Sequence, residues 1–179
     1  LGFKISIVPF HTWVPDVYEG SNPLLAAFIA IVPKIATFAI IIRIFTPFMY
    51  SHSPFIEYVL YALVVLTMTI PNLIALTQTD VKRMLAYSSI SHSGFVLGAI
   101  LINAPQIVFL YWFLFLFTNI GAFGILWLSQ NDKDSEDNYT FTSLGGMIKT
   151  NTTLAVLLTL FMFALAGIPP FSVFWGKMY

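Results

Sequence analysis

Four titratable side chains lie within or beside long apolar segments, where their acid–base chemistry would be unusual: Lys4, Lys34, His92 and Lys177. An ionisable residue inside a membrane segment by default indicates an ion or proton path. Each also has a structural interpretation. Lys4 and Lys177 could be interfacial lysines that extend to the headgroups, and His92 could be a buried histidine that donates to a carbonyl. The four residues are therefore candidates for a proton path, and no catalytic residue is predicted.

Lys34 makes the strongest case, because it occupies the middle of the apolar segment 23–45. A helix of this length, at ~1.5 Å per residue, spans a hydrocarbon core of ~30 Å. Arg43 can snorkel to the headgroups from its place near the end of the segment, but Lys34 cannot. A central lysine costs roughly 2.5–3.5 kcal/mol, and the preceding Pro33 removes a helix hydrogen bond. An ion path or a lysine neutralised by a structural partner would account for it.

His92 lies ten residues beyond Lys82, which places it ~15 Å deep at helical rise. Ser88 precedes it by four residues and shares its helix face, and Ser91 flanks it. A proton-relay role and a satisfied core histidine remain equally open.

The hydropathy pattern predicts an all-α, polytopic transmembrane helix bundle. The chain is 58% hydrophobic and 9% charged, whereas soluble domains carry about 25% charged residues. We expect one membrane domain over residues 1–179, an internal piece of a longer chain, because it opens on Leu1 inside an apolar segment. Its expected parts are the end of a broken helix over 1–13, complete spans over 23–45, 55–78, 83–103 and 106–129, and an interrupted span over 152–179.

Prolines predict discontinuities in three of these helices: at Pro9, at Pro71–Asn72, and at the sequence GIPPF that starts at Gly167. Irregular backbone at membrane depth is tolerated where it lines a cavity. The runs IVPFHTW and IPPFSVF resemble each other, and inverted repeats with broken helices recur in transporters. Between the helices we expect a polar connection over 11–23, a short loop around Pro47, His52 and Pro54, and a polar loop over 130–149 with a solvated acidic cluster.

The connections at 11–23, 79–83 and 130–151 should share one side of the membrane. They hold Lys82, Arg83, Lys133 and Lys149, whereas the opposite side holds only Arg43. The positive-inside rule then places this side in the cytoplasm, or in the matrix of a mitochondrion.

Composition also restricts the chemistry. The chain has no cysteine, so we expect no disulfide and no thiolate-held iron–sulfur cluster. Its three histidines are scattered, which argues against a haem or zinc site. No basic cluster is present, so nucleic acid is not an expected partner. We therefore predict no cofactor, metal or redox centre in this chain.

Four runs, PFHTWVPDVYEG, VPKIATF, TDVKRMLAYSSISHSG and AGIPPFSVFWGK, resemble the antiporter-like membrane subunits of respiratory complex I, and the resemblance covers essentially the whole chain. It implies two inverted five-helix repeats, broken helices, and a midplane chain of lysines and histidines that moves protons. Lys4 would match the lysine of the first broken helix, Lys34 the connecting lysine, and Lys177 that of the second broken helix. The carboxylate that the family pairs with the first lysine would lie upstream of Leu1.

The resemblance implies a proton-translocating subunit of NADH:quinone oxidoreductase, with quinone, flavin and iron–sulfur sites in other subunits. Its partners would be neighbouring antiporter-like subunits and the lipid of a bacterial inner membrane, or of a mitochondrial inner membrane. Two alternatives stay open: a subunit of a multisubunit cation/proton antiporter, and a membrane scaffold that pumps nothing.

Overall fold

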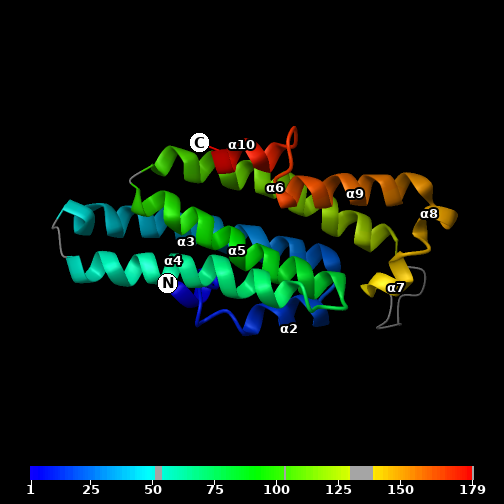
Figure 1. Ribbon diagram of the computed structural model, residues 1–179, viewed down its shortest axis with the longest axis horizontal. Coiled ribbons are helices and arrows are strands. Elements are labelled where there is room, and N and C mark those ends of the chain that lie inside the picture. Colours follow the sequence, from blue (N-terminus) through cyan, green and yellow to red (C-terminus); the bar gives the residue numbers. More distant parts are fainter. Residues whose placement is uncertain (51–53, 103, 130–138, 179) are drawn as a thin grey trace.

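The computed structural model describes residues 1–50, 54–102, 104–129 and 139–178. Over these residues the regular structure is helical, which confirms the predicted all-α fold (Figure 1). The helices are α1 (Gly2–Ile5), α2 (Trp13–Gly20), α3 (Pro23–Tyr50), α4 (Pro54–Ala75), α5 (Val81–Leu101), α6 (Pro105–Leu128), α7 (Phe141–Leu144), α8 (Met147–Thr150), α9 (Thr152–Ala166) and α10 (Ser172–Met178). The loop predicted around His52 and the acidic cluster predicted at 132–137 lie outside the described residues.

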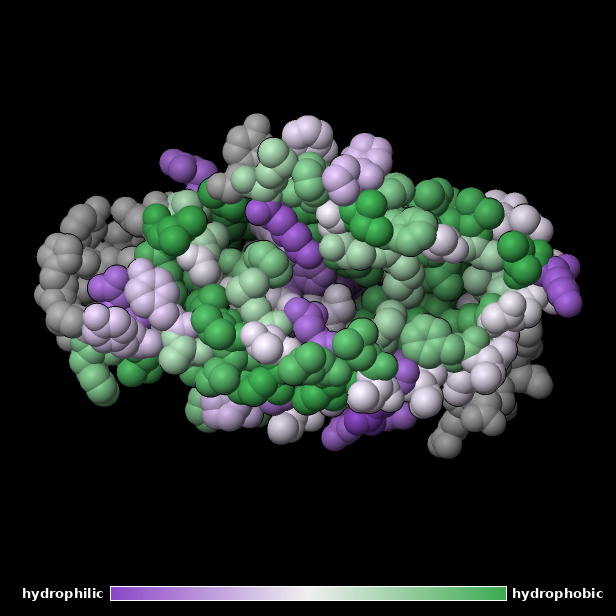
Figure 2. Space-filling view, in the orientation of Figure 1, coloured by the Kyte–Doolittle hydropathy of each residue, from purple (hydrophilic) through white to green (hydrophobic). Residues whose placement is uncertain are grey.

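Four helices of the described part are long and apolar enough to cross a membrane. Their apolar stretches are Pro23–Ile44, Phe55–Ala75, Val81–Leu101 and Gln106–Leu128. Figure 1 shows these long helices running side by side along the length of the molecule, with α9 along α6. The surface seen in Figure 2 is largely hydrophobic along this length. A bundle with such a surface is stable where lipid or further protein covers it.

Helix α5 is the central helix of the bundle. It packs against α2, α3, α4 and α6, and about two thirds of its apolar stretch is buried. The Asp80 carboxylate caps its first turn by accepting from the Arg83 backbone N–H at 3.0 Å. Its serines and His92 thereby come to lie inside the protein rather than against lipid, as polar groups in a membrane helix require.

Two helices are broken, and the two breaks have the same backbone geometry. Ser6 (φ 62°) and Gly167 (φ 81°) adopt the left-handed conformation directly after α1 and α9. A cis peptide bond to proline follows each, at Pro9 and at Pro170. The predicted interruption at Gly167 is confirmed. The first break begins at Ser6, three residues before the Pro9 that was expected to cause it.

Matching hydrogen bonds extend the likeness between the breaks. The Ile7 N–H donates to the Gly2 carbonyl at 3.1 Å, and the Ile168 N–H donates to the Phe163 carbonyl at 3.2 Å. One turn later, Phe10 donates to Ile7, and Phe171 donates to Ile168. Each pair is offset by the same number of residues, so the short sequence echo between IVPFHTW and IPPFSVF reflects a shared backbone motif.

Two local expectations were wrong, and the structure adds a helix to a third region. The interruption expected at Pro71–Asn72 is absent, since α4 continues through Pro71 to Ala75. The Asn72 side-chain amide donates to the Met68 carbonyl at 2.7 Å, whereas the carbonyl that Pro71 leaves without its helix partner is that of Thr67. Helix α3 continues past its predicted end at 45 to Tyr50. The connection expected over 11–23 contains α2, which packs on α5.

The connections that were predicted to share one side do lie together. Arg83 forms ion pairs with Asp16, at 3.1 Å, and with Glu19. The Lys82 ammonium donates to the Ser21 carbonyl at 3.3 Å. Residues after the polar loop join the same end, because the Phe141 N–H donates to the Thr79 carbonyl at 3.1 Å. The basic residues of α5 are therefore gathered at one end of the bundle.

Helices α4 and α5 approach closely at Gly94, which generates a first prediction. A Cβ at Gly94 would lie 2.8 Å from Met68 Cγ, 3.2 Å from Met68 N and 3.3 Å from Thr67 C. Backbone atoms cannot move aside cheaply, so we expect Gly94→Ala to destabilise the protein by about 1–3 kcal/mol. The measurement is the melting temperature of the complete detergent-solubilised protein.

Gly124→Ala is the matched control, because nothing lies within 4 Å of a Cβ at Gly124. This change should be neutral or should stabilise by up to about 1 kcal/mol through helix propensity. Equal melting temperatures for the two variants would show that the contact at Gly94 does not limit packing.

Candidate functional site

The Lys34 amine is buried against α5 and is held by three neutral oxygen atoms. It is 2% exposed. It donates to Ser89 Oγ at 2.7 Å, to Ser93 Oγ at 3.0 Å and to the Ser89 carbonyl at 3.0 Å. Among the described residues no carboxylate forms an ion pair with it. The site therefore gives Lys34 hydrogen-bond partners without fixing its charge.

Ser89 extends the Lys34 site toward α2. Its hydroxyl lies 3.4 Å from the Tyr18 hydroxyl, and either group can donate. Ser93 also donates to the Ser89 carbonyl at 3.0 Å. Because a hydroxyl both donates and accepts, these groups can accept from an ammonium or donate to a neutral amine.

His92 lies on the same helix between these serines, and it is 4% exposed. Its Nδ1 is hydrogen-bonded to the Tyr111 hydroxyl of α6, and its ring packs on Phe115 with centroids 4.7 Å apart. Lys177 lines the same cavity as His92, and the two serines that hold Lys34 precede and follow His92 on α5. The three titratable groups are thus gathered around one helix.

Lys177 reaches back from α10 to the second helix break. Its amine donates to the Ala166 carbonyl at 3.3 Å and lies 4.9 Å from the centroid of the Phe95 ring. The last carbonyls of a helix lack intrahelical partners and form the negative end of its dipole, so the break after α9 suits a cation. Helix α10 lies close to α6 because Gly176 has no side chain, and a Cβ there would lie 2.9 Å from Tyr111 Cδ2.

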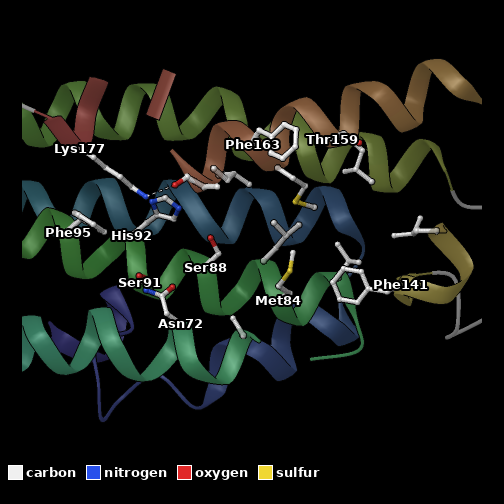
Figure 3. Close-up of a pocket in the computed structure, with 18 residues that line it drawn as sticks. Asn72, Met84, Ser88, Ser91, His92, Phe95, Phe141, Thr159, Phe163 and Lys177 are labelled. Carbon is white, nitrogen blue, oxygen red and sulfur yellow. Dashed lines mark hydrogen bonds between the residues drawn. The ribbon is translucent and has the colours of Figure 1, made fainter. Parts of the chain in front are cut away.

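A cavity of about 720 Å³ joins His92 and Lys177 to the end of the bundle where α5 begins. Figure 3 shows Lys177 extending from α10 toward His92, with Ser91 of α5 near His92, and Ser88 of α5 and Phe141 of α7 farther along the cavity. In Figure 2 the molecule is hollowed near the middle of this face, and hydrophilic side chains show in the hollow. The cavity offers water a route from that end to the buried histidine.

Lys4 stays apart from this group. It is exposed in the last turn of α1, and it does not line the cavity of His92 and Lys177. His11, after the same break, is buried, and its Nδ1 has no partner within the described residues. The structure thus gathers Lys34, His92 and Lys177, but not Lys4.

The sequence pattern pointed to Ser88 and Ser91, which do line the cavity beside His92. It missed Ser89 and Ser93, which hold Lys34, and Tyr111, which holds His92. The spacing of Ser89 and Ser93 by four residues was a usable signal for a shared helix face. Which serine face meets Lys34 depends on how α3 packs on α5, and a single sequence does not state that.

Comparison with known proteins assigns this arrangement to a family. The family model described as "NADH:quinone oxidoreductase/Mrp antiporter, TM" matches residues 1–179. The chain is 74% identical over 185 aligned residues to NADH-quinone oxidoreductase subunit N of Helicobacter hepaticus. The alignment covers 100% of this chain and 38% of that relative, so the chain spans little more than a third of the relative's length.

Two solved structures superpose on almost the whole of this chain. A chain of respiratory complex I from Thermus thermophilus with bound aureothin superposes with a TM-score of 0.83 at 33% identity, over 99% of this chain and 38% of that one. A chain of the Mrp complex from Dietzia sp. superposes with a TM-score of 0.75 at 22% identity, over 99% of this chain and 33% of that one. The second similarity concerns the fold alone.

A double-mutant cycle tests the hydrogen bonds to Lys34. Ser89→Ala removes the acceptor at 2.7 Å, and a hydrogen bond to a charged group contributes about 1.5–3 kcal/mol. We expect this loss in the parent and a clearly smaller loss in a Lys34→Met background. The measurement is the melting temperature of the assembled complex. Ser88→Ala is the control, and an equal cost of Ser89→Ala in both backgrounds would contradict the coupling.

Proposed function

The chain belongs to the NADH:quinone oxidoreductase/Mrp antiporter transmembrane family, and we propose that it is the proton-conducting part of subunit N of a bacterial NADH:quinone oxidoreductase. In this proposal its lysines and histidine move protons through the middle of the membrane while electron transfer takes place in other subunits. The similarity to subunit N of Helicobacter hepaticus supports the choice of subunit.

One observation carries the proposal: within the part of the chain that the structure describes, the Lys34 amine is buried and its partners are hydroxyl and carbonyl oxygens. A lysine that served only to fix the fold would be expected to face a carboxylate, because burying an unpaired charge is costly. Hydroxyl groups instead tolerate the amine in either protonation state. A group that has partners in both states can take up a proton and release it.

The proposed path uses residues in three places. Water in the large cavity would bring protons to His92 and Lys177. The serines of α5, Ser89 and Ser93, would connect that region to Lys34. Lys4 would serve a further part of the path with a partner outside this chain, since it is exposed here. Because Lys34, His92 and Lys177 are gathered around α5, the charge of one group would influence the next.

The remaining features of the proposal concern the whole complex. We place the chain in the bacterial inner membrane, with its basic end, near Lys82 and Arg83, on the cytoplasmic side. Its partners would be the adjacent antiporter-like membrane subunits and lipid. It would hold no cofactor, and the NADH, quinone and iron–sulfur chemistry would belong to other subunits.

A subunit of a multisubunit cation/proton antiporter is the second candidate, favoured by the superposition on the Mrp complex. Its 22% identity is well below the 74% identity to the Helicobacter hepaticus subunit N, so we rank this function lower. A scaffold without transport fits poorly, because it would gain nothing from a buried amine.

Replacing Lys34 tests the proposed function. Lys34→Ala removes the titratable amine, so we expect an assembled complex with most of its NADH-driven proton uptake lost. Lys34→Arg should not restore uptake, since a guanidinium keeps its proton. Uptake is measured in inverted membrane vesicles with quinone as acceptor, and assembly is checked on a native gel.

Arg43→Ala is the matched control, because Arg43 is exposed on the same helix. This variant should pump normally, whereas a scaffold role for Lys34 predicts normal pumping for both variants. Full proton uptake by an assembled Lys34→Ala complex would remove Lys34 from the path.

A further inference from the structure

A second cavity lies on the other side of Lys177 from the first. It has a volume of about 330 Å³ and extends to the turn between α5 and α6, where Leu101, Ile102 and Ile107 line it. The first cavity extends to the opposite end of α5, where Val81 and Phe141 line it. The two cavities thus approach the middle of the bundle from its two ends.

The two cavities have two lining residues in common, Phe95 and Lys177. These residues contact each other, with the Lys177 amine 4.9 Å from the centroid of the Phe95 ring. The Phe95 ring also stacks on Tyr111, with centroids 6.3 Å apart and planes 20° apart. Tyr111 lines the second cavity, and its hydroxyl is hydrogen-bonded to His92. His92 lines the first cavity. The ring is thus packed at the place where the cavities meet.

We propose that the Phe95 ring, held against the Lys177 amine, is the gate that separates the two cavities. This inference rests on the proposed proton path and adds a residue that carries no proton itself. An apolar ring between two cavities blocks a continuous chain of water molecules. Phe95 is therefore a positioning residue, which acts through the lysine.

Charge on Lys177 would control this gate. A cation is attracted to the face of an aromatic ring, and a neutral amine is not. When the Lys177 ammonium gives a proton to water in one cavity, an N–H bond breaks, an O–H bond forms, and the attraction to Phe95 ends. The amine then turns on its flexible four-carbon stem to the other cavity and takes a proton from water there. The other titratable groups that line the cavities are His92, Tyr61 and Tyr111.

The test measures access rather than pumping. Residues 1–179 include no cysteine, so a cysteine introduced here adds a labelling signal that the parent complex lacks: Ser91→Cys for the first cavity and Ala99→Cys for the second. The signal of each variant is read on the separated subunit, as the difference from the parent complex treated in the same way. Sealed vesicles of both orientations are treated, without NADH, with a charged, membrane-impermeant methanethiosulfonate reagent. With Phe95 present, each cysteine should react from one side only, and the two sides should be opposite.

Phe95→Ala should abolish this one-sided reaction, so that each cysteine reacts from both sides. Phe95→Tyr should retain it, because the ring face is kept. Phe113→Ala is the control, since Phe113 is exposed on α6 and lines neither cavity, and it should leave the one-sided reaction unchanged.

Three outcomes would overturn the gate: reaction from both sides with Phe95 present, unchanged one-sided reaction in Phe95→Ala, or failure of either cysteine to react at all. NADH-driven proton uptake by the same vesicles reports separately on the proposed function. Pumping without one-sided access would refute the gate alone, and one-sided access without pumping would refute the function alone.

Discussion

The buried amine of Lys34 is the constraint on which the rest of the structure depends. An ammonium group in an apolar bundle is stable only if several oxygen atoms replace the water that it has lost. Here all three partners come from Ser89 and Ser93 on α5. The helix that carries so many polar groups must then be covered on all sides, and α2, α3, α4 and α6 cover it. The arrangement of the bundle follows from the need to keep one polar helix away from lipid.

Small residues allow neighbouring helices to pack closely around α5 and its buried groups. Gly94 lets α4 approach α5 until its backbone contacts the glycine. Gly176 lets α10 lie against Tyr111, which in turn holds His92. In a membrane there is little hydrophobic force between helices, so close packing and hydrogen bonds carry much of the association. The residues that position the titratable groups are therefore as important to the site as the groups themselves.

The sequence indicates how deep in the membrane a residue of a helix lies, but not which neighbouring helix its side chain faces. The burial of Lys34 and His92 and the break at Gly167 followed from counting residues along apolar segments and from the properties of glycine and proline. The predicted break at Pro71 was wrong because a membrane helix can continue through a proline, as α4 does, so a single proline in the sequence does not distinguish a broken helix from a continuous one. Ser89, Ser93 and Tyr111 were missed because their roles depend on which helix faces which.

The two helix breaks share a backbone conformation, but they differ in whether a titratable side chain binds there. Both end a helix with a left-handed residue and share the same local hydrogen bonds, and a helix that ends in this way presents unpaired carbonyls with partial negative charge. At the second break the Lys177 amine returns from α10 to the Ala166 carbonyl. At the first break Lys4 precedes the left-handed Ser6 and is exposed. The two breaks therefore match in backbone, but within the described residues only the second holds a lysine amine, and that lysine is the one that lines the cavity with His92.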